Sequence, residues 1–143
     1  MASASLALPW PPSVNVAWYR GMKGSLTKKG RVFRDDVINI VRSRSLIARS
    51  QSLLVGFTSS VRVDLYFFPP DRRVRDNSNH TKVLYDALTK AGFWADDSLI
   101  KSETYHSGNV VKGGSVVLFC EEVDYLLWDF DQVRESLGVE KIS

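Results

Sequence analysis

The chain has 143 residues, of which 44% are hydrophobic and 24% are charged, and its formal net charge is +3. These values are typical of one globular domain with its own hydrophobic core. They exclude a wholly disordered or collagen-like chain, and Cys120 alone cannot form an internal disulfide. No apolar run reaches the roughly 18 residues of a membrane helix, and no signal-peptide pattern precedes Arg20. We therefore expect a cytoplasmic protein with no membrane association.

The charges are unevenly distributed along the chain. Residues 1–82 carry 14 basic and five acidic side chains, whereas residues 83–143 carry five basic and 11 acidic ones. An asymmetry of this kind is a hint of nucleic-acid contact. Two solvated faces whose charges cancel explain the charge distribution equally well.

The first half of the chain predicts a strand, a proline-rich connection and a long helix. Residues 4–8 have the pattern of a short strand, and the prolines of 9–13 prevent regular structure after it. Residues 14–26 are ambiguous, with strand-like and bend-like features. Thr27 is a suitable N-cap for a helix over residues 28–49, where apolar side chains recur at helical spacing.

The second half predicts alternating strands and helices. Val61–Phe68 alternates as a strand, and residues 79–91 have one apolar helical face followed by Gly92 at a C-cap position. Two further strands over 99–106 and 114–121, joined by a glycine-containing turn, and a short helix over 129–138 complete the chain. The order of elements indicates a mixed α/β or α+β domain.

Two charged segments flank the predicted helix over residues 79–91. One is Asp71-Arg-Arg-Val-Arg-Asp-Asn-Ser-Asn-His-Thr-Lys82, and the other is Trp94-Ala-Asp-Asp97. A helix of about 13 residues is about 20 Å long. Asp76 and Asp97 therefore meet only if the second segment folds back along the helix, or if a strand carries it there.

These residue types suit chemistry on phosphodiesters. Mg²⁺ prefers oxygen ligands, and one or two carboxylates together with a substrate phosphate can hold it. A nearby lysine stabilises developing charge, and arginines hold a phosphate backbone. From the residue types alone, a surface Arg/Asp network with Ser78 as a helix cap is the more frequent arrangement.

Several segments match one known pattern. They are Leu8-Pro-Trp-Pro-Pro-Ser-Val-Asn15, Trp18-Tyr19-Arg20, the run from Pro70 to Asp97, and the turn Lys112-Gly113-Gly114. In these segments the chain resembles the RusA-like Holliday junction resolvases, over roughly residues 6–122. The resemblance implies a single α+β domain over 1–122, with a mixed sheet and flanking helices, that acts as a homodimer. Residues 123–143 would be a C-terminal extension with a short helix.

The resemblance also implies an activity and a set of site residues. It implies a Mg²⁺-dependent endonuclease, with Mn²⁺ able to substitute, that cuts four-way DNA junctions by paired symmetric nicks. Such proteins are typical of phages and prophages in bacterial hosts. Asp76 matches the first aspartate of the family site, Asp97 the last, Lys82 its lysine, and Asn79 also matches a family position.

The chain departs from the commonest family pattern at Ser78, where aspartate is usual. Serine keeps the N-cap capacity of aspartate but loses the charge, so we expect weaker metal binding or a changed second metal site. We expect activity to survive with Asp76, Asp97 and Asp96 as metal ligands. Two alternatives are a junction-binding protein that has lost cleavage and a less selective nuclease of branched DNA.

The basic residues near the site are candidate DNA contacts. Arg72, Arg73 and Arg75 lie next to the predicted metal ligands. Around the first loop and helix start, the candidates are Lys23, Lys28, Lys29, Arg31 and Arg34. For this second group a solvated face is equally plausible.

The aromatic residues and the histidines carry less specific expectations. Trp10, Trp18 and Tyr19 can stack on opened bases, although packing is the more frequent role for Trp10. We expect His80 on the helix surface and Cys120 buried in a strand. We expect the acidic, aromatic residues 123–143 to cover the domain or to join the dimer interface. A mimic of DNA charge is a less favoured alternative.

Overall fold

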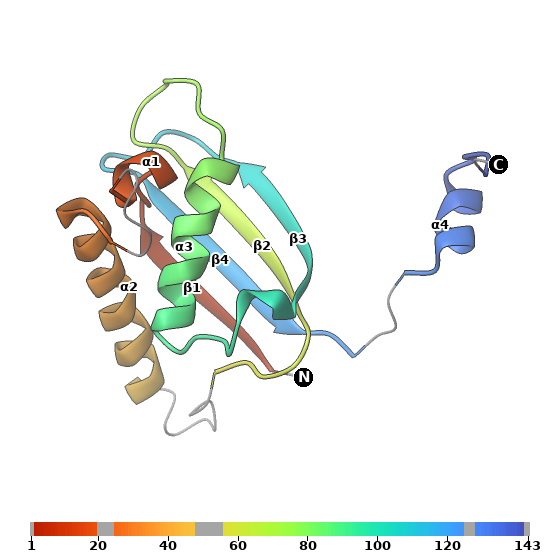
Figure 1. The fold of residues 1–143 in the computed structure, drawn as a ribbon, viewed down its shortest axis with the longest axis horizontal. Helices are drawn as coiled ribbons and strands as arrows, with labels where there is room; N and C mark the ends of the chain where they lie inside the picture. Colours follow the sequence, from red (N-terminus) through yellow and green to blue (C-terminus); the bar gives the residue numbers. More distant parts are fainter. Residues whose placement is uncertain (1, 20–24, 48–55, 125–127, 142–143) are drawn as a thin grey trace.

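The computed structural model describes residues 2–19, 25–47, 56–124 and 128–141. A four-stranded sheet with the order β1-β4-β2-β3 has two long helices, α2 and α3, packed on one face (Figure 1). The elements are β1 (Ser3–Pro9), α1 (Val14–Ala17), α2 (Lys28–Ile47), β2 (Val61–Phe68), α3 (Ser78–Lys90), the 3₁₀ turn η2 (Asp97–Leu99), β3 (Ile100–Ser107), β4 (Ser115–Glu122) and α4 (Phe130–Ser136). The predicted α+β class and its mixed sheet are confirmed, while residues 48–49 of the predicted helix lie outside the described part.

The sheet is mixed because of how β2 pairs with its two neighbours. β2 runs parallel to β3 and antiparallel to β4, and β4 is also antiparallel to β1. β3 and β4 follow each other in sequence, yet β2 lies between them. The connecting turn therefore passes the end of β2, where the amide of Gly108 donates to the Phe67 carbonyl at 2.8 Å. Gly113 and Gly114 adopt φ of 79° and 73°, a region that favours glycine.

Gly30 lies in the first turn of α2, although helices normally avoid glycine. Thr27 is the predicted N-cap, because its hydroxyl oxygen accepts a hydrogen bond from the Gly30 amide at 3.2 Å. A Cβ at Gly30 would lie 2.4 Å from the carbonyl oxygen of Ala17, so the close approach of α1 and α2 requires glycine here. Most of the ambiguous segment is resolved as well: α1 is helical, and Trp18 pairs with Leu26 in an antiparallel bridge.

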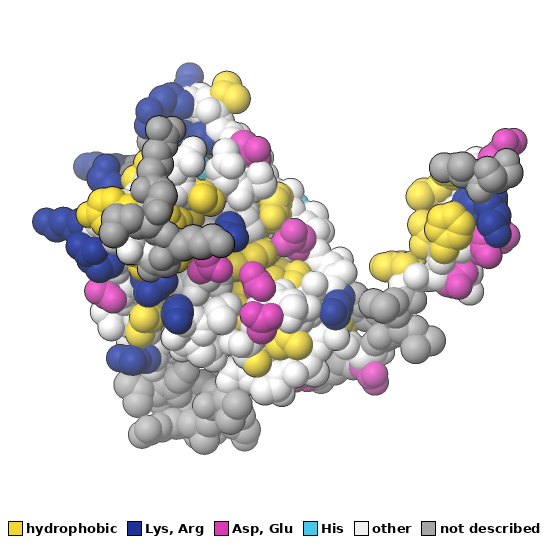
Figure 2. Space-filling model, viewed as in Figure 1, with side chains coloured by type: hydrophobic (Ala, Val, Ile, Leu, Met, Phe, Trp, Pro, Cys, Tyr) yellow, Lys and Arg dark blue, Asp and Glu magenta, His cyan; other side chains and the backbone are white. Residues whose placement is uncertain are grey.

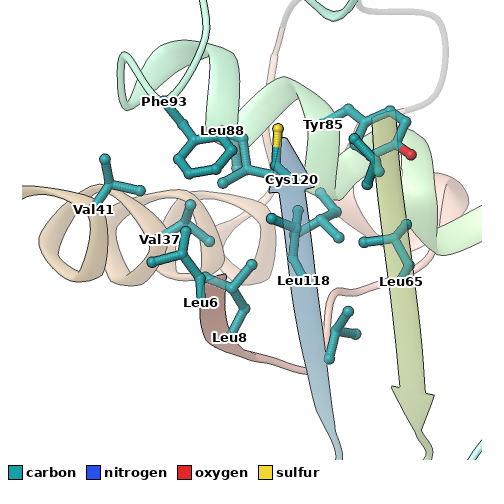
Figure 3. Packing of buried hydrophobic residues seen from close by; sticks show 14 of the residues in the cluster. Leu6, Leu8, Val37, Val41, Leu65, Tyr85, Leu88, Phe93, Leu118 and Cys120 are labelled. Atoms are coloured by element: carbon teal, nitrogen blue, oxygen red, sulfur yellow. The ribbon is translucent and has the colours of Figure 1, made fainter. Parts of the chain in front are cut away.

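The core lies between the sheet and the two long helices (Figure 3). Alternate residues of β2 point into it, and Cys120 of β4 is buried, as expected. The predicted apolar face of α3 is confirmed, because Val83, Leu84, Ala87 and Leu88 are buried. This packing fixes α3 against β2 and β3, and so fixes the residues at both ends of the helix.

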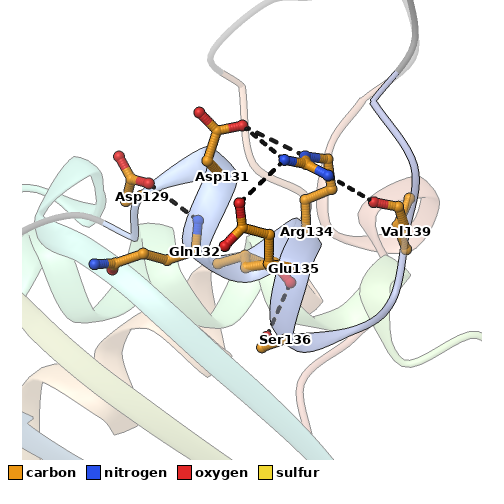
Figure 4. Close-up of polar contacts among 8 residues, drawn as sticks. Asp129, Asp131, Gln132, Arg134, Glu135, Ser136 and Val139 are labelled. Atoms are coloured by element: carbon orange, nitrogen blue, oxygen red, sulfur yellow. Dashed lines mark hydrogen bonds and ion pairs between the residues drawn. The ribbon is translucent and has the colours of Figure 1, made fainter.

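The C-terminal helix α4 stands away from the sheet (Figure 1). Asp129 caps it by accepting from the Gln132 amide, and Arg134 pairs with Asp131 at 3.2 Å (Figure 4). Trp128 and Phe130 are 80% and 67% exposed. The predicted short helix is confirmed, but within one chain it does not cover the domain. Among the described residues, no helix is long and apolar enough to cross a membrane.

Candidate active site

The first predicted ligand, Asp76, lies two residues before the start of α3. Its carboxylate accepts two hydrogen bonds from Ser78, one from the hydroxyl at 2.7 Å and one from the amide at 3.0 Å. Its carbonyl accepts from the Asn79 amide at 3.1 Å. The hydrogen bond from the Ser78 hydroxyl, followed by that from the amide, holds the pKa of Asp76 below its usual value. Asp76 is therefore an exposed, charged carboxylate at neutral pH.

The loop after α3 turns back toward the helix. Phe57, which precedes β2, forms a parallel bridge with Trp94. Its amide donates to the Phe93 carbonyl at 3.0 Å, and its carbonyl accepts from the Ala95 amide at 2.9 Å. Trp94 is 1% exposed and donates through Nε1 to the Thr89 hydroxyl at 2.8 Å. These contacts return the chain toward the middle of α3 before it reaches Asp97.

The charge of Asp97 consequently affects the pKa of Asp86, in the middle of the helix. Burial raises the pKa of Asp86, the positive charge of Lys82 opposes the rise, and the negative charge of Asp97 adds to it. Lys82 and Asp86 are one helical turn apart, so the three charged groups share one side of α3. Sequence reasoning missed Asp86, although its spacing of four residues from Lys82 was a usable signal.

Two tyrosines and a glutamate form a hydrogen-bonded network next to Asp97. The hydroxyls of Tyr85 on α3 and Tyr105 on β3 both donate to the carboxylate of Glu103. Asp97, Tyr85 and Glu103 line a shallow pocket of about 410 Å³ beside β3. Burial raises the pKa of Tyr105, the hydroxyl of Thr81 opposes the rise, and the charges of Glu103 and Asp76 add to it. Asp97 acts on the pKa of Tyr85 and Asp76 on that of Tyr105, so each predicted carboxylate lies near one of the two tyrosines.

Acidic side chains gather over α3 and β3, and basic side chains lie mostly over α2 and the loop before α3 (Figure 2). Glu103 and the two tyrosines gave no sequence signal, because the parallel pairing of β2 with β3 brings them to α3. Only the three-dimensional register places Glu103 opposite Val63, on the helix-covered face.

Asp96 has a different environment from Asp97. Its carboxylate accepts from the Ser98 amide at 3.2 Å and caps η2. Of the two neighbouring aspartates, only Asp97 lines the pocket. The structure thus brings Asp97, rather than Asp96, to the side of α3 that carries Lys82.

The donor set fits a hard cation that is held jointly with a substrate. Exposed carboxylate oxygens are the ligands that Mg²⁺ and Mn²⁺ accept, usually with waters and substrate phosphates completing the shell. Among the described residues, no group of three His, Cys, Asp or Glu side chains is placed to hold a metal ion by itself.

The arginine-rich loop has one structural and two exposed arginines. Arg75 pairs with Asp71 at 2.7 Å, is 14% exposed and lies over the ring of Trp10 at 5.7 Å. Arg73 is 80% exposed, and its hydrogen bonds together with Arg75 lower the pKa of Asp71 to about 2. Arg72 is exposed as well. Arg75 therefore shapes the loop, while Arg72 and Arg73 face solvent.

The other predicted DNA contacts lie around the start of α2. Lys28 and Lys29 are exposed, and Arg31 is held by the Leu26 carbonyl at 2.8 Å. Arg34 is half-buried, and its positive charge lowers the pKa of Asp86. The start of α2 therefore faces α3. Lys23 lies outside the described residues.

The prediction for His80 was wrong. This residue is 8% exposed, its Nδ1 lies 2.8 Å from the Pro11 carbonyl oxygen, and its ring packs on Trp10. The proline-rich segment after β1 covers the first turn of α3, a long-range contact with no local sequence signal. Trp10 itself packs edge-on against Phe67, in line with the expected packing role.

Fold and site together define a mixed α+β domain whose carboxylates, lysine and arginines lie around a single helix. Residues 9–117 match the profile of the family described as Endodeoxyribonuclease RusA. The crossover junction endodeoxyribonucleases RusA of Shigella sonnei and of Escherichia coli K12 are each 36% identical to this chain over 125 residues, covering 86% of it and 98% of the relative. The crossover junction endodeoxyribonuclease of Enterobacteria phage 82 is 35% identical over the same shares. The chain belongs to the RusA endodeoxyribonuclease family.

Proposed function

We propose that this protein is a divalent-metal-dependent endonuclease, with Mg²⁺ as its usual metal, that resolves four-way DNA junctions by paired symmetric nicks. One observation carries the proposal: the chain spans 98% of relatives named crossover junction endodeoxyribonuclease. Nucleases of this family generally depend on a divalent metal. The phage relative and the bacterial ones favour a phage- or prophage-type protein that acts in the cytoplasm of a bacterial host.

The positions of the residues support the roles that this proposal gives them. Asp76 and Asp97 hold the metal together with a phosphate of the DNA, and Asp96 supports Asp97 by capping η2. The bound metal activates water and stabilises the charge that develops on the cleaved phosphate. Lys82, on the same side of α3 as Asp97, adds a positive charge for that transition state.

The remaining predicted residues serve DNA binding. Arg72 and Arg73 offer exposed guanidinium groups at the entrance to the site, and Arg75 holds their loop in place. Lys28 and Lys29 extend the basic surface along the start of α2. Asn79, exposed in the first turn of α3, lies beside Asp76 and is a candidate phosphate contact.

A second candidate function is junction binding without efficient cleavage. It is favoured by Ser78, because a hydroxyl replaces a carboxylate next to Asp76 and no preformed three-carboxylate group exists among the described residues. We rank it second, since the hydroxyl leaves Asp76 ionised and a DNA phosphate can complete the metal shell.

Paired nicks require two active sites, and we therefore propose a homodimer. Each protomer would cut one of two strands of like sequence around the branch point. Doubling the basic surface also suits a four-armed polyanion. Sedimentation of the purified protein tests the homodimer separately. The single chain has a mass of 16.1 kDa, and a species of twice that mass is expected. A monomer at the concentrations used for cleavage would overturn the homodimer.

The function is tested with three labelled DNAs: a four-way junction, a linear duplex and a Y-fork, each with Mg²⁺, Mn²⁺ or EDTA. Symmetric nicks in the junction alone, abolished by EDTA, are the expected result. Binding of the junction without nicks would support the second candidate. Comparable cutting of the fork would indicate a less selective nuclease of branched DNA.

A further inference from the structure

A groove of about 900 Å³ lies next to the candidate active site. Three segments form it: the proline-rich connection after β1, the start of α2 and the arginine-rich loop. Its apolar wall includes Trp10, Val32, Phe33 and Val74. Hydrophobic side chains framed by Lys and Arg are visible on this part of the surface (Figure 2). We call it the Trp10 groove.

Several apolar side chains of the Trp10 groove are exposed among the residues that the structure describes. Val74, at the tip of the arginine-rich loop, is fully exposed, and Val32 on α2 is 51% exposed. Val16 on α1 also lines the groove and is 43% exposed. A surface that keeps several valines in water beside a tryptophan is suited to an apolar or flat aromatic ligand.

The charged residues of the groove have one predominant sign. Lys28, Lys29, Arg73 and Arg75 line it, against the single carboxylate of Asp36. Cations at the edge of an aromatic wall are the combination by which proteins hold single-stranded nucleic acid, with phosphates on the cations and bases on the rings.

The wall is held in place before any ligand binds. Trp10 contacts Phe67, His80 and Arg75, with ring separations of 6.0 Å and 5.2 Å and a cation–ring distance of 5.7 Å. A Cβ at Gly114 would lie 2.7 Å from the Cβ of Trp10, so the turn before β4 supports the tryptophan from behind. A rigid aromatic wall loses little entropy on binding a base.

The groove and the active site share one stretch of backbone. Arg75 lines the groove, and the next residue, Asp76, is the first candidate metal ligand. His80, in the first turn of α3, also lines the groove, two residues before Lys82. A strand whose phosphate lies at Asp76 therefore has its neighbouring nucleotide within reach of Trp10.

We propose that the Trp10 groove binds one unpaired nucleotide of branched DNA. Its base lies against Trp10 and the valines, and its phosphate lies on Lys28, Lys29 or Arg73. The proposal rests on the proposed function for the nature of the ligand, and it adds a reason for junction selectivity. A base can enter the groove only where the branch point leaves it unstacked, which a continuous duplex does not.

The acidic, aromatic C-terminal segment is the other chemically suitable occupant. Trp128 and Phe130 are exposed, and Asp129 and Asp131 alternate with them. We favour the nucleotide because the groove adjoins Asp76, and because four cations stand at its edge. The test below separates the two occupants.

The experiment combines changes in the DNA with changes in the full-length protein, in EDTA so that binding is measured alone. Each nucleotide bordering the branch point of a four-way junction is replaced in turn by an abasic residue, which removes the base and keeps the phosphates. At one or more positions we expect wild-type affinity to fall about tenfold, the usual effect of losing one stacked base. Val74→Asp and Val32→Asp should weaken binding of the intact junction similarly, and with them the abasic change should have no further effect.

Val139→Asp is the matched control, because it places the same new charge at a 55% exposed valine outside the groove. Val139→Asp should bind the intact junction with wild-type affinity and show the wild-type loss of affinity with the abasic junction. An abasic effect of equal size in wild type and Val74→Asp would overturn the groove proposal while leaving junction binding and cleavage intact. Tighter junction binding by Phe130→Ser, with no dependence on any base, would assign the groove to the C-terminal segment and also overturn it. Failure of the wild type to bind any four-way junction would overturn the proposed function itself.

Discussion

The hydroxyl of Ser78 donates a hydrogen bond to the carboxylate of Asp76, with 2.7 Å between the two oxygens. Ser78 thus orients the carboxylate of Asp76 and lowers its pKa. The local arrangement keeps Asp76 ionised, while Ser78 itself adds no negative charge.

The first prediction concerns this pair. Ser78→Asp should raise the affinity for Mn²⁺ or leave it equal, because a second carboxylate oxygen becomes available beside Asp76. Ser78→Ala should change it little, since Asp76 is exposed and stays ionised at neutral pH without this hydrogen bond. Mn²⁺ titration followed by electron paramagnetic resonance measures both without any DNA. A lower Mn²⁺ affinity of Ser78→Asp than of the wild type would contradict the placement of Ser78 beside the metal.

The second prediction concerns Asp86, whose pKa is raised chiefly by burial. A carboxyl with a folded-state pKa above its unfolded value lowers stability as the pH rises through that interval, because the folded state then retains the proton. Asp86→Asn should therefore raise the melting temperature at neutral pH, and the gain should shrink near pH 3, where both states bind the proton. Thermal melts across this range measure the effect.

Asp124→Asn is the control for Asp86→Asn, because Asp124 is an exposed carboxylate beyond the end of β4. It should change the melting temperature little at any pH. A destabilising effect of Asp86→Asn at neutral pH would mean that the interaction of Asp86 with Lys82 outweighs its burial, and would contradict the prediction.

The third prediction concerns the backbone contact that returns the loop to α3. A Cβ at Gly56 would lie 2.1 Å from the Gly92 carbonyl oxygen, so Gly56→Ala must displace the bridge between Phe57 and Trp94. We expect a loss of about 1–3 kcal/mol in unfolding free energy and a fall in cleavage that exceeds the fall in junction affinity. Urea unfolding measures the unfolding free energy, filter binding measures the junction affinity, and single-turnover kinetics measure the cleavage rate.

Gly138→Ala is the control for backbone strain without a clash. Gly138 has a φ of +69° and open space around it, after α4. This variant should leave cleavage unchanged. Equal losses of affinity and cleavage in Gly56→Ala would show that the loop matters for binding and does not position Asp97.

The fourth prediction concerns the only cysteine. Cys120 is fully buried in β4, and burial, followed by the charges of Glu121 and Glu122, raises its thiol pKa to about 12. A disulfide reagent at pH 8 should therefore react only as fast as the protein unfolds, and addition of denaturant should make the reaction rapid. Because the folded pKa lies above the unfolded one, stability should also fall as the pH rises above about 9. Rapid labelling of the native protein would contradict the burial of β4.

Much of the fold could be predicted because its signals are local. The alternation in Val61–Phe68, the apolar face of α3, the Thr27 cap and Gly92 each depend on neighbouring residues. The order of the sheet could not be predicted, because the position of β2 between two consecutive strands is a long-range property. The burial of His80 was missed for the same reason, since the segment that covers it is about 70 residues away.

The candidate site shows the same division. The resemblance to the RusA-like family supplied Asp76, Lys82 and Asp97, and the condition that the loop must fold back was recognised from helix length alone. The contact that turns this loop back joins Phe57 to Trp94 and has no local pattern. Glu103 depends on the register of a parallel strand pair, so sequence periodicity could not bring it to the site.

The most direct test of the account is strand-by-strand mapping of nicks on a four-way junction, with each of the four strands labelled in turn. Wild-type protein with Mg²⁺ should nick two opposing strands at symmetric positions. Asp97→Asn should bind the same junction with similar affinity and leave every strand intact. Undiminished nicking by Asp97→Asn, or unpaired cuts scattered over all four strands by the wild type, would contradict the assignment of a junction-resolving nuclease built around this carboxylate.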